Sequence, residues 1–238
     1  MTTDLDAEKQ TAADELQEQQ RTNEGVARAS GILAFGSILS RVLGLAREIV
    51  LSNLFGASRA LEAFNNALVI SKSLYDLLLA GHVNSAIVPV LSEVVTVQGR
   101  RELWRLVSVL VSVVTAGAMA LVAILTLFAP QIVSLIAGSD PETTALSAML
   151  LQLTAPALIL LCLFAVLSGT LYALRQFSLP SLAGAIFNGT SVLVTLLFVP
   201  GLEYVPQLTA SGAVWTLQRS DDGIIIVAVA WLAAAAAQ

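Results

Sequence analysis

The sequence predicts an all-α integral membrane protein, a polytopic helix bundle. Of its 238 residues, 56% are hydrophobic and only 12% are charged, and its mean hydropathy is +0.81. Ordinary globular chains carry about 25% charged residues, roughly twice this share. Uncharged apolar runs recur along the chain. Because a spanning helix needs about 20 mainly apolar residues, we expect about six transmembrane helices.

The net charge of −5 arises in the first 24 residues, which hold seven acidic and two basic side chains. The rest of the chain has ten charges of each sign, so it lacks the basic face that a nucleic-acid partner requires. Residues 1–25 are polar and contain no apolar core, which excludes a cleaved signal peptide. We expect a disordered or loosely helical cytoplasmic tail over residues 1–25, followed by a transmembrane lobe over residues 26–238.

The first helix is expected over residues 26–54, and it carries charges within its apolar run. Its uncharged part, Ala29–Ser40, has 12 residues, too few to cross a bilayer. The helix therefore spans only if Arg41, Arg47 and Glu48 enter the membrane region or lie at its edge. A charge at the bilayer centre costs about 2.5–3.5 kcal/mol on insertion scales, so such residues mark a pathway or a cavity.

The same helix carries a seam of small residues. Gly36, Ser40 and Gly44 recur every four residues and so share one face. Small side chains at this spacing allow the backbone of a second helix to approach closely. We expect this face to pack against another helix.

The second helix is expected over residues 60–95, with Gly81 and Pro89 as bend points. At 100° per residue, a polar stripe follows one side of it. The stripe consists of Glu62, Asn66, Ser73, Asp76, Ala80 and Asn84. Lys72 lies about 80° from this line. Because lipid solvates such side chains poorly, the stripe is expected to face a polar cavity or another polar helix.

Four further helices are expected from uncharged runs, over residues 104–129, 143–174, 178–200 and 223–238. Pro130 ends the first of these, Pro156 is expected to kink the second, and Pro180 lies near the start of the third. Residues 203–222 are expected to form a polar loop. The final run has 16 residues. At 1.5 Å per residue it is about 24 Å long, shorter than a hydrocarbon core of about 30 Å, which indicates an incomplete sixth helix.

The distribution of basic residues predicts a cytoplasmic amino terminus. With that orientation only Arg59 and Arg219 lie in outer loops. The inner segments then hold Arg21, Arg28, Arg100, Arg101, Arg105 and Arg175.

Four segments resemble the lipid II flippase family, MurJ or MviN, of the multidrug/oligosaccharidyl-lipid/polysaccharide exporter superfamily. They are SRVLGLARE (40–48), LFGASRALEAF (54–64), AGHVNSAIVPVLSE (80–93) and RQFSLPSLAGAIFN (175–188). The pair Ala230-Trp231 also fits the sixth helix of that family. The resemblance implies a two-lobe transporter of the bacterial plasma membrane, of which this chain is the amino-terminal lobe.

For function, the resemblance implies a flippase that moves a lipid-linked peptidoglycan precursor, lipid II, to the outer face by alternating access. Its partners would be lipid II or a similar polyprenyl-pyrophosphate-linked saccharide, membrane lipids and a carboxy-terminal lobe. Arg41 and Arg47 match first-helix arginines that contact the pyrophosphate in that family, and Glu48 matches the acid that follows them. Glu62 stands where the family often has Asp.

The candidate substrate-binding residues are therefore Arg41, Arg47, Glu48, Glu62 and Asp76, with Asn66, Lys72 and Ser73 as a further cavity wall. The planar guanidinium fork of arginine suits bidentate phosphate contacts and stays charged when desolvated. The structural alternative is that the arginines pair with Glu48, Glu62 or Asp76 and hold two helices together. Glu48 is expected to reach Arg41, and Lys72 to pair with Asp76.

Two positions depart from the family pattern. Tyr75-Asp76 replaces a pair of arginines, and Ala80-Gly81 replaces a Glu-Gly pair. The second helix is therefore neutral or acidic, which leaves open export of another polyprenyl-linked saccharide or of an amphiphilic cation. A further alternative is a non-transporting scaffold for cell-wall synthesis that binds partners through the acidic tail.

The sequence offers no motif for chemical catalysis. It contains no nucleophile–base pair and no phosphate-binding loop, and its single histidine, His82, rules out a histidine-cluster metal site. Its single cysteine, Cys162, lies in an apolar run. We expect no enzyme activity, no cofactor and no metal.

Overall fold

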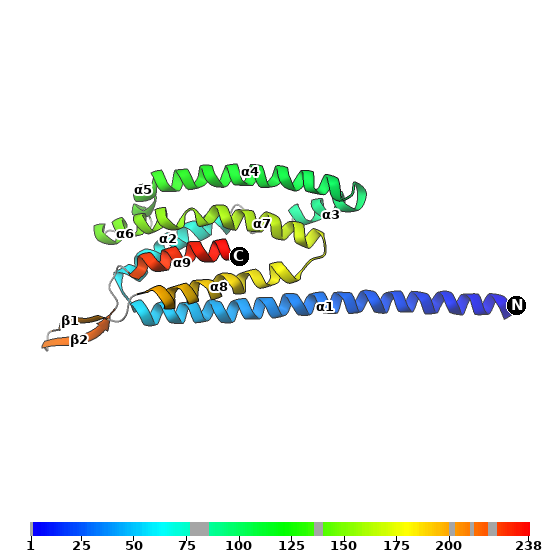
Figure 1. The fold of residues 1–238 in the computed structure, drawn as a ribbon, viewed down its shortest axis with the longest axis horizontal. Coiled ribbons are helices and arrows are strands. Elements are labelled where there is room, and N and C mark those ends of the chain that lie inside the picture. Colours follow the sequence, from blue (N-terminus) through cyan, green and yellow to red (C-terminus); the bar gives the residue numbers. More distant parts are fainter. Residues whose placement is uncertain (1, 77–85, 136–139, 200–202, 210–211, 219–222) are drawn as a thin grey trace.

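The computed structural model describes residues 2–76, 86–135, 140–199, 203–209, 212–218 and 223–238 (Figure 1). Within this part the chain forms helices that lie side by side along one long axis and a single two-stranded sheet. The helices are α1 (Thr2–Phe55), α2 (Arg59–Tyr75), α3 (Val88–Val97), α4 (Arg100–Leu127), α5 (Ala129–Ser134), α6 (Pro141–Thr154), α7 (Ala157–Ala173), α8 (Ser178–Phe198) and α9 (Gly223–Ala237). Strands β1 (Glu203–Thr209) and β2 (Gly212–Gln218) form the sheet. The predicted all-α membrane fold is confirmed for the bundle.

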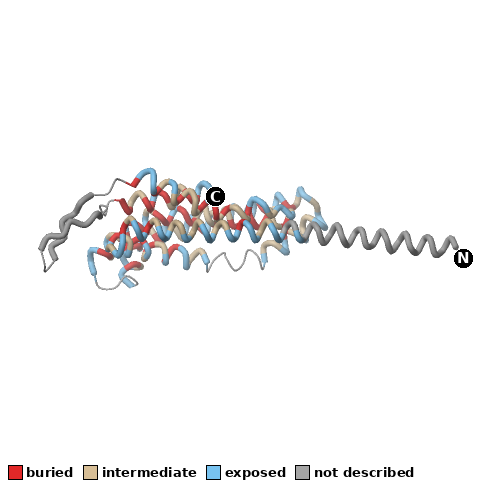
Figure 2. Tube along the Cα trace, turned by 90° about the horizontal axis from the view of Figure 1, so that it is seen from below, coloured by how far each residue is buried: buried red, intermediate tan, exposed pale blue. Residues whose placement is uncertain are grey.

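Among the described residues, two helices are long and apolar enough to cross a membrane on their own. They are α4, with a mean hydropathy of 2.4, and α8, with 1.7. Helices α6 and α7 pass the same test together as one span bent by 43°. The bend lies at Ala155 and Pro156, so the kink predicted at Pro156 is confirmed. Only 11% of the apolar stretch of α4 is buried, as lipid contact requires. Figure 2 shows exposed residues along the outside of the bundle.

Helices α1 and α8 lie in close contact along the predicted small-residue seam. A Cβ atom added at Gly36 would overlap the carbonyl oxygen of Ser181, so the two backbones meet there. One turn further, Asn188 donates through Nδ2 to the carbonyl oxygen of Ser40 at 3.2 Å. Gly44 faces the same Asn188 side chain. The expected packing of this face against another helix is confirmed.

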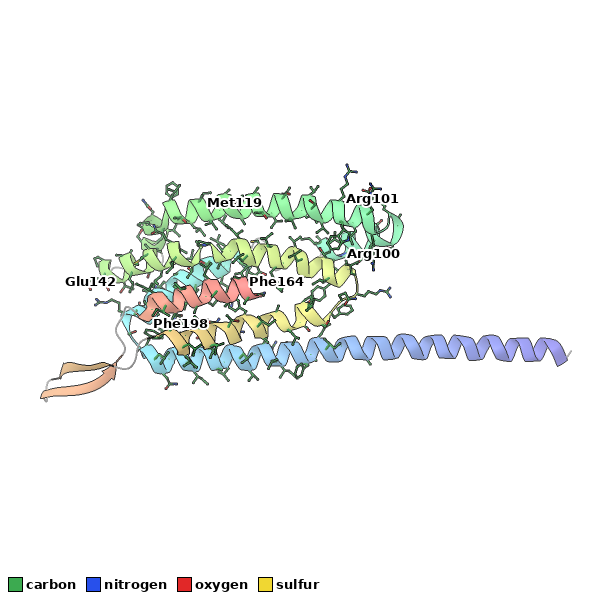
Figure 3. All side chains as sticks on the ribbon, in the orientation of Figure 1. Arg100, Arg101, Met119, Glu142, Phe164 and Phe198 are labelled. Atoms are coloured by element: carbon green, nitrogen blue, oxygen red, sulfur yellow. The ribbon has the colours of Figure 1, made fainter. Side chains whose placement is uncertain are left out.

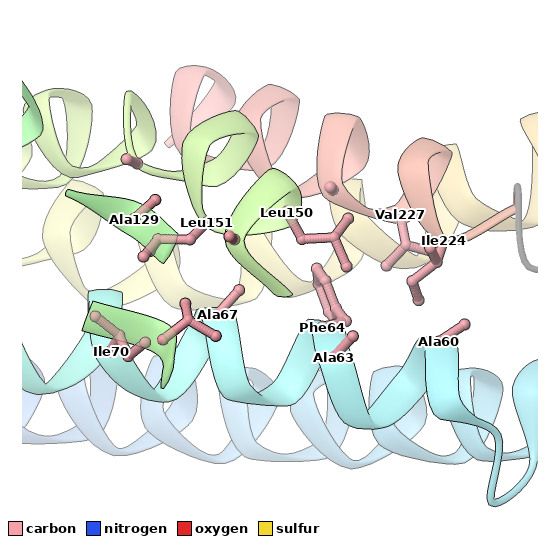
Figure 4. Packing of buried hydrophobic residues seen from close by; sticks show 14 of the residues in the cluster. Ala60, Ala63, Phe64, Ala67, Ile70, Ala129, Leu150, Leu151, Ile224 and Val227 are labelled. Carbon is pink, nitrogen blue, oxygen red and sulfur yellow. The ribbon is translucent and has the colours of Figure 1, made fainter. Parts of the chain in front are cut away.

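Helix α2 begins after a turn at Gly56, where φ is +59°, and its amino terminus is capped by Ser58, whose Oγ accepts from the Leu61 amide at 3.3 Å. One face of the helix is buried against α6 and α9 (Figure 4). Phe64 is 1% exposed, and Leu150 and Ile224 are fully buried in the same cluster. Because lipid tails are as apolar as these side chains, van der Waals packing is what holds helices together within a membrane.

Three segments can be compared with the sequence expectation. Residues 2–25, expected as a disordered or loosely helical tail, continue the backbone of α1 as helix. Of the second predicted helix the structure describes α2 and α3, while the expected bend point Gly81 lies outside the described residues and Pro89 lies in the first turn of α3. The expected loop 203–222 contains an antiparallel hairpin in the register Glu203↔Gln218 to Thr209↔Gly212.

Candidate functional site

Arg47 lies on the packed side of α1, close to the small-residue seam. Its side chain is 17% exposed, and its guanidinium carbon lies 5.1 Å from the centre of the Trp231 ring. Its Nη2 donates to Glu48 Oε1 at 2.6 Å. Its Nε is buried and has no hydrogen-bond partner in the part of the chain that the structure describes. A permanently charged group is therefore held in an apolar bundle with unused donors.

Trp231 of α9 is held at a fixed angle by two further aromatic rings. The Phe187 ring of α8 meets it edge-to-face at 4.7 Å and 88°. The Phe64 ring of α2 does so at 6.4 Å and 83°. These are preferred geometries for aromatic pairs. Trp231 thus connects three helices of the bundle with Arg47 of α1.

Glu48 pairs with its neighbour Arg47, whereas the sequence predicted Arg41 as its partner. Arg41 is exposed, and no acidic side chain among the described ones lies within 4.0 Å of it. The proposed alternative role of the arginines, pairing with Glu62 or Asp76 across helices, is likewise not seen among the described side chains. The Arg47–Glu48 pair lies within α1, so it does not link this helix to another one.

The polar stripe of α2 lies opposite to the buried face of that helix. Glu62, Ser73 and Asp76 are exposed and Asn66 is half-buried, while Ala80 and Asn84 lie outside the described residues. Near the start of α2, Glu62 and Asn66 line an open hollow of about 310 Å³. The other lining residues are Gly56, Ala57, Ser58, Leu61 and Asn65.

Lys72 is exposed and lines a second, narrow cavity of about 40 Å³. Tyr75 and Trp231 line it as well, together with Ser71, Thr154, Ala157, Leu158 and Leu161. The predicted Lys72–Asp76 ion pair is absent from the described structure. The structure therefore brings Arg47, Glu48 and Trp231 together and places Lys72 at a cavity on the same tryptophan, whereas Arg41 and the Glu62 hollow remain separate.

Trp231 is not among the site residues predicted from the sequence, although two signals point to it. Trp231 is the only aromatic residue in the run from Gly223 to Gln238. On α1, Arg47 lies within about 20° of Gly36 and Ser40 at 100° per residue. The arginine therefore shares the face that the seam predicts to be packed against another helix.

A separate group of charges lies where α2 and α6 begin. Arg59 contacts Asp140 at 3.4 Å, between Nε and Oδ2, and also pairs with Glu142. Asp140 caps α6, because its Oδ2 accepts from Thr143 Oγ1 at 2.5 Å and from the Thr143 amide at 3.3 Å. These hydrogen bonds, and then the charge of Arg59, lower the pKa of the Asp140 carboxyl below its ordinary value.

A model of the family described as lipid II flippase MurJ matches residues 51–238. The chain belongs to the lipid II flippase MurJ family. The match includes Trp231 and the polar stripe of α2, and it begins after Arg41, Arg47 and Glu48.

Sequence identity to individual MurJ proteins supports this assignment. The chain is 32% identical to a probable lipid II flippase MurJ of Synechocystis sp. over 176 residues, which are 73% of this chain and 32% of that protein. It is 31% identical to the lipid II flippase MurJ of Burkholderia cenocepacia over 182 residues, 75% of this chain and 35% of that protein. The chain thus spans about a third of the length of these relatives.

A solved structure shares the fold. It is a lipid II flippase MurJ in an inward closed conformation, and it matches with a TM-score of 0.66 and 26% identity. The match covers 85% of this chain and 39% of that one. The helix arrangement is therefore that of one part of a MurJ membrane transporter.

Proposed function

We propose that this chain forms part of a lipid II flippase, in which it contacts the pyrophosphate of the lipid-linked precursor. The observation that carries the proposal is Arg47. Its guanidinium is largely buried in the bundle of a MurJ family member, and in the described structure its only ion pair is with the neighbouring Glu48. A charge in such a place is costly, so it favours a functional role.

Arginine suits this role for physical reasons. Its planar fork forms bidentate hydrogen bonds with phosphate oxygens, and its charge offsets the desolvation of a pyrophosphate that enters the membrane. Arg41 is exposed on the same helix and supplies a second cation. We further propose that the polar stripe of α2, with Glu62, Asp76 and Lys72, lines the path of the headgroup.

We also propose the orientation and the kind of activity. The protein is placed in the bacterial plasma membrane with its amino terminus in the cytoplasm, since the basic residues at the start of α4 lie at that end of the bundle (Figure 3). Moving a headgroup between leaflets makes and breaks no covalent bond, so we propose no enzyme activity. The proposed partner is lipid II. The rest of a full-length MurJ fold would complete the transporter.

Substitution Arg47→Glu tests the proposal. A cell depleted of its own flippase is supplied with a full-length family protein that carries residues 1–238 of this chain. We expect the unsubstituted protein to restore growth and Arg47→Glu to abolish rescue, because the substitution places a carboxylate beside the pyrophosphate and so brings two like charges into one site.

Binding is measured in parallel with lipid II in nanodiscs, where Arg47→Gln should weaken affinity by at least tenfold, in line with about 1.5–3 kcal/mol for a charged hydrogen bond. Arg101→Gln is the matched control, because Arg101 is exposed at the start of α4. Full rescue by Arg47→Glu at normal expression would refute the assigned role. Rescue lost on deletion of residues 1–25 alone would favour the scaffold alternative.

A further inference from the structure

The Arg47 guanidinium lies against the Trp231 ring inside the bundle. Its carbon lies 5.1 Å from the centre of the Trp231 ring, within the distance of about 6 Å at which a cation is attracted to an aromatic face. Tryptophan is the strongest aromatic partner for such a contact. The attraction is larger where water is excluded, and the Arg47 side chain is only 17% exposed.

The contact with the ring leaves N–H donors of the guanidinium without a partner among the described residues. The five N–H donors of arginine lie in the plane of the group. In the described structure one donor, on Nη2, binds Glu48, and the buried Nε has no partner. Donors in the plane of the fork are the ones that bind phosphate oxygens bidentately.

The orientation of the Trp231 ring is fixed by neighbouring aromatic side chains. The Phe187 and Phe64 rings meet the Trp231 ring at 88° and 83°, from α8 and α2. Free rotation of the indole would break both edge-to-face contacts. The ring that Arg47 contacts is therefore held in place by side chains from α2 and α8, although Arg47 and Trp231 are far apart in the sequence.

We propose that Trp231 is a positioning residue, which holds the Arg47 guanidinium so that its N–H edge meets the pyrophosphate of a polyprenyl lipid. The inference rests on the proposed function and deepens it, because it assigns a residue on α9 to the substrate site. Trp231 acts on the lipid through Arg47 and need not touch the lipid.

Two substitutions separate positioning from packing. Trp231→Phe keeps a π face and Trp231→Met keeps an apolar side chain without one. Binding of undecaprenyl pyrophosphate to the chain in nanodiscs is measured for both. We expect Trp231→Met to lose about 3- to 30-fold in affinity and Trp231→Phe to recover a large part of that loss.

Leu125→Ala serves as the packing control. Leu125 is 2% exposed on α4, so its truncation should lower the melting temperature with little change in affinity. If Trp231 were only a packing residue, the Met and Phe variants would behave as Leu125→Ala does. Equal affinities for wild type, Trp231→Phe and Trp231→Met would overturn the inference and leave the proposed function standing.

Fluorescence provides a readout that packing would not change. The chain has three tryptophans, so the double substitution Trp104→Phe and Trp215→Phe leaves Trp231 as the only one. We expect undecaprenyl pyrophosphate to shift the emission of Trp231, and Arg47→Gln to abolish the shift. An unchanged emission at saturating lipid would overturn the positioning role. Absence of any lipid binding by the wild-type chain would overturn the proposed function, and the inference with it.

Discussion

Asp140 shows how one side chain stabilises both a helix start and a contact between two helices. Its carboxylate accepts two hydrogen bonds from Thr143 and faces the guanidinium of Arg59 at the start of α2. A carboxylate at a helix amino terminus also interacts favourably with the helix dipole. Because Arg59 follows the α1–α2 turn directly, Asp140 ties that turn to the start of α6.

The lowered pKa of Asp140 gives this contact a pH dependence. A group with a depressed pKa in the folded state stabilises the fold above its unfolded-state pKa, near 3.8, and loses this contribution as pH falls through the folded-state pKa. We expect Asp140→Asn to lower the melting temperature at pH 7, and the difference from wild type to shrink as the pH falls below 3.8. Melting in detergent between about pH 7 and about pH 3 measures it. A difference that stays constant over this range would contradict the assignment.

Helices α1 and α8 approach each other closely because small residues face each other on both. Gly36 meets the Ser181 backbone, and Gly184 meets Ser40. Asn188, near the middle of α8, adds a hydrogen bond to the Ser40 carbonyl, the kind of polar contact that joins helices within membranes. This pair also sets the position of Arg47, since the arginine lies on the same face of α1.

Substitution Gly36→Ala tests the α1–α8 contact. The new methyl group would overlap the Ser181 carbonyl oxygen, so the helices must separate. We expect a loss of about 1–3 kcal/mol in stability, the usual cost of overpacking. Gly117→Ala on α4 is the matched control, because no atom lies within 4 Å of the position where its Cβ would be.

The control should be neutral or stabilising by up to about 1 kcal/mol, since alanine is the better helix former. Denaturation of both variants in the same detergent measures the two effects. Similar destabilisation by both substitutions would show that helix propensity, rather than the seam, explains the result.

At the scale of the whole molecule, the amino terminus of α1 and the β1–β2 hairpin lie at opposite ends of the long axis (Figure 1). If the long axis runs across the membrane, the two segments are on opposite sides of it. With the proposed cytoplasmic amino terminus, the hairpin is placed on the outer side. The start of α4, with Arg100 and Arg101, then lies on the cytoplasmic side.

Single cysteines at these two ends test the orientation. The native Cys162 is 3% exposed, so it gives little background labelling. We expect a membrane-impermeant maleimide to label Gly212→Cys in intact cells, and to label Thr3→Cys only after the membrane is opened. The reverse pattern would show the opposite orientation, and labelling of both in intact cells would show that the long axis does not cross the membrane.

Features that depend on one segment of chain were predictable from the sequence. Regular spacing of Gly36, Ser40 and Gly44 identified a packed face, a proline identified the 43° bend between α6 and α7, and helical periodicity placed Glu62 and Asp76 on the unburied side of α2. The charged run around Arg41 and Arg47 likewise marked α1 as unusual. Each signal is local, because helix geometry alone determines which side chains share a face.

Contacts between distant segments required the tertiary structure. Glu48 lies seven residues after Arg41 and next to Arg47, and only the folded structure shows that it pairs with Arg47. The hairpin depends on hydrogen bonds between β1 and β2 that no periodicity of a single strand specifies. Above all, Arg47 contacts Trp231, whose ring is held by Phe64 and Phe187. These side chains meet only when α1, α2, α8 and α9 are packed together. The sequence by itself determined that cations lie within the apolar run of α1, and only the packing of four helices decided where the Arg47 guanidinium lies.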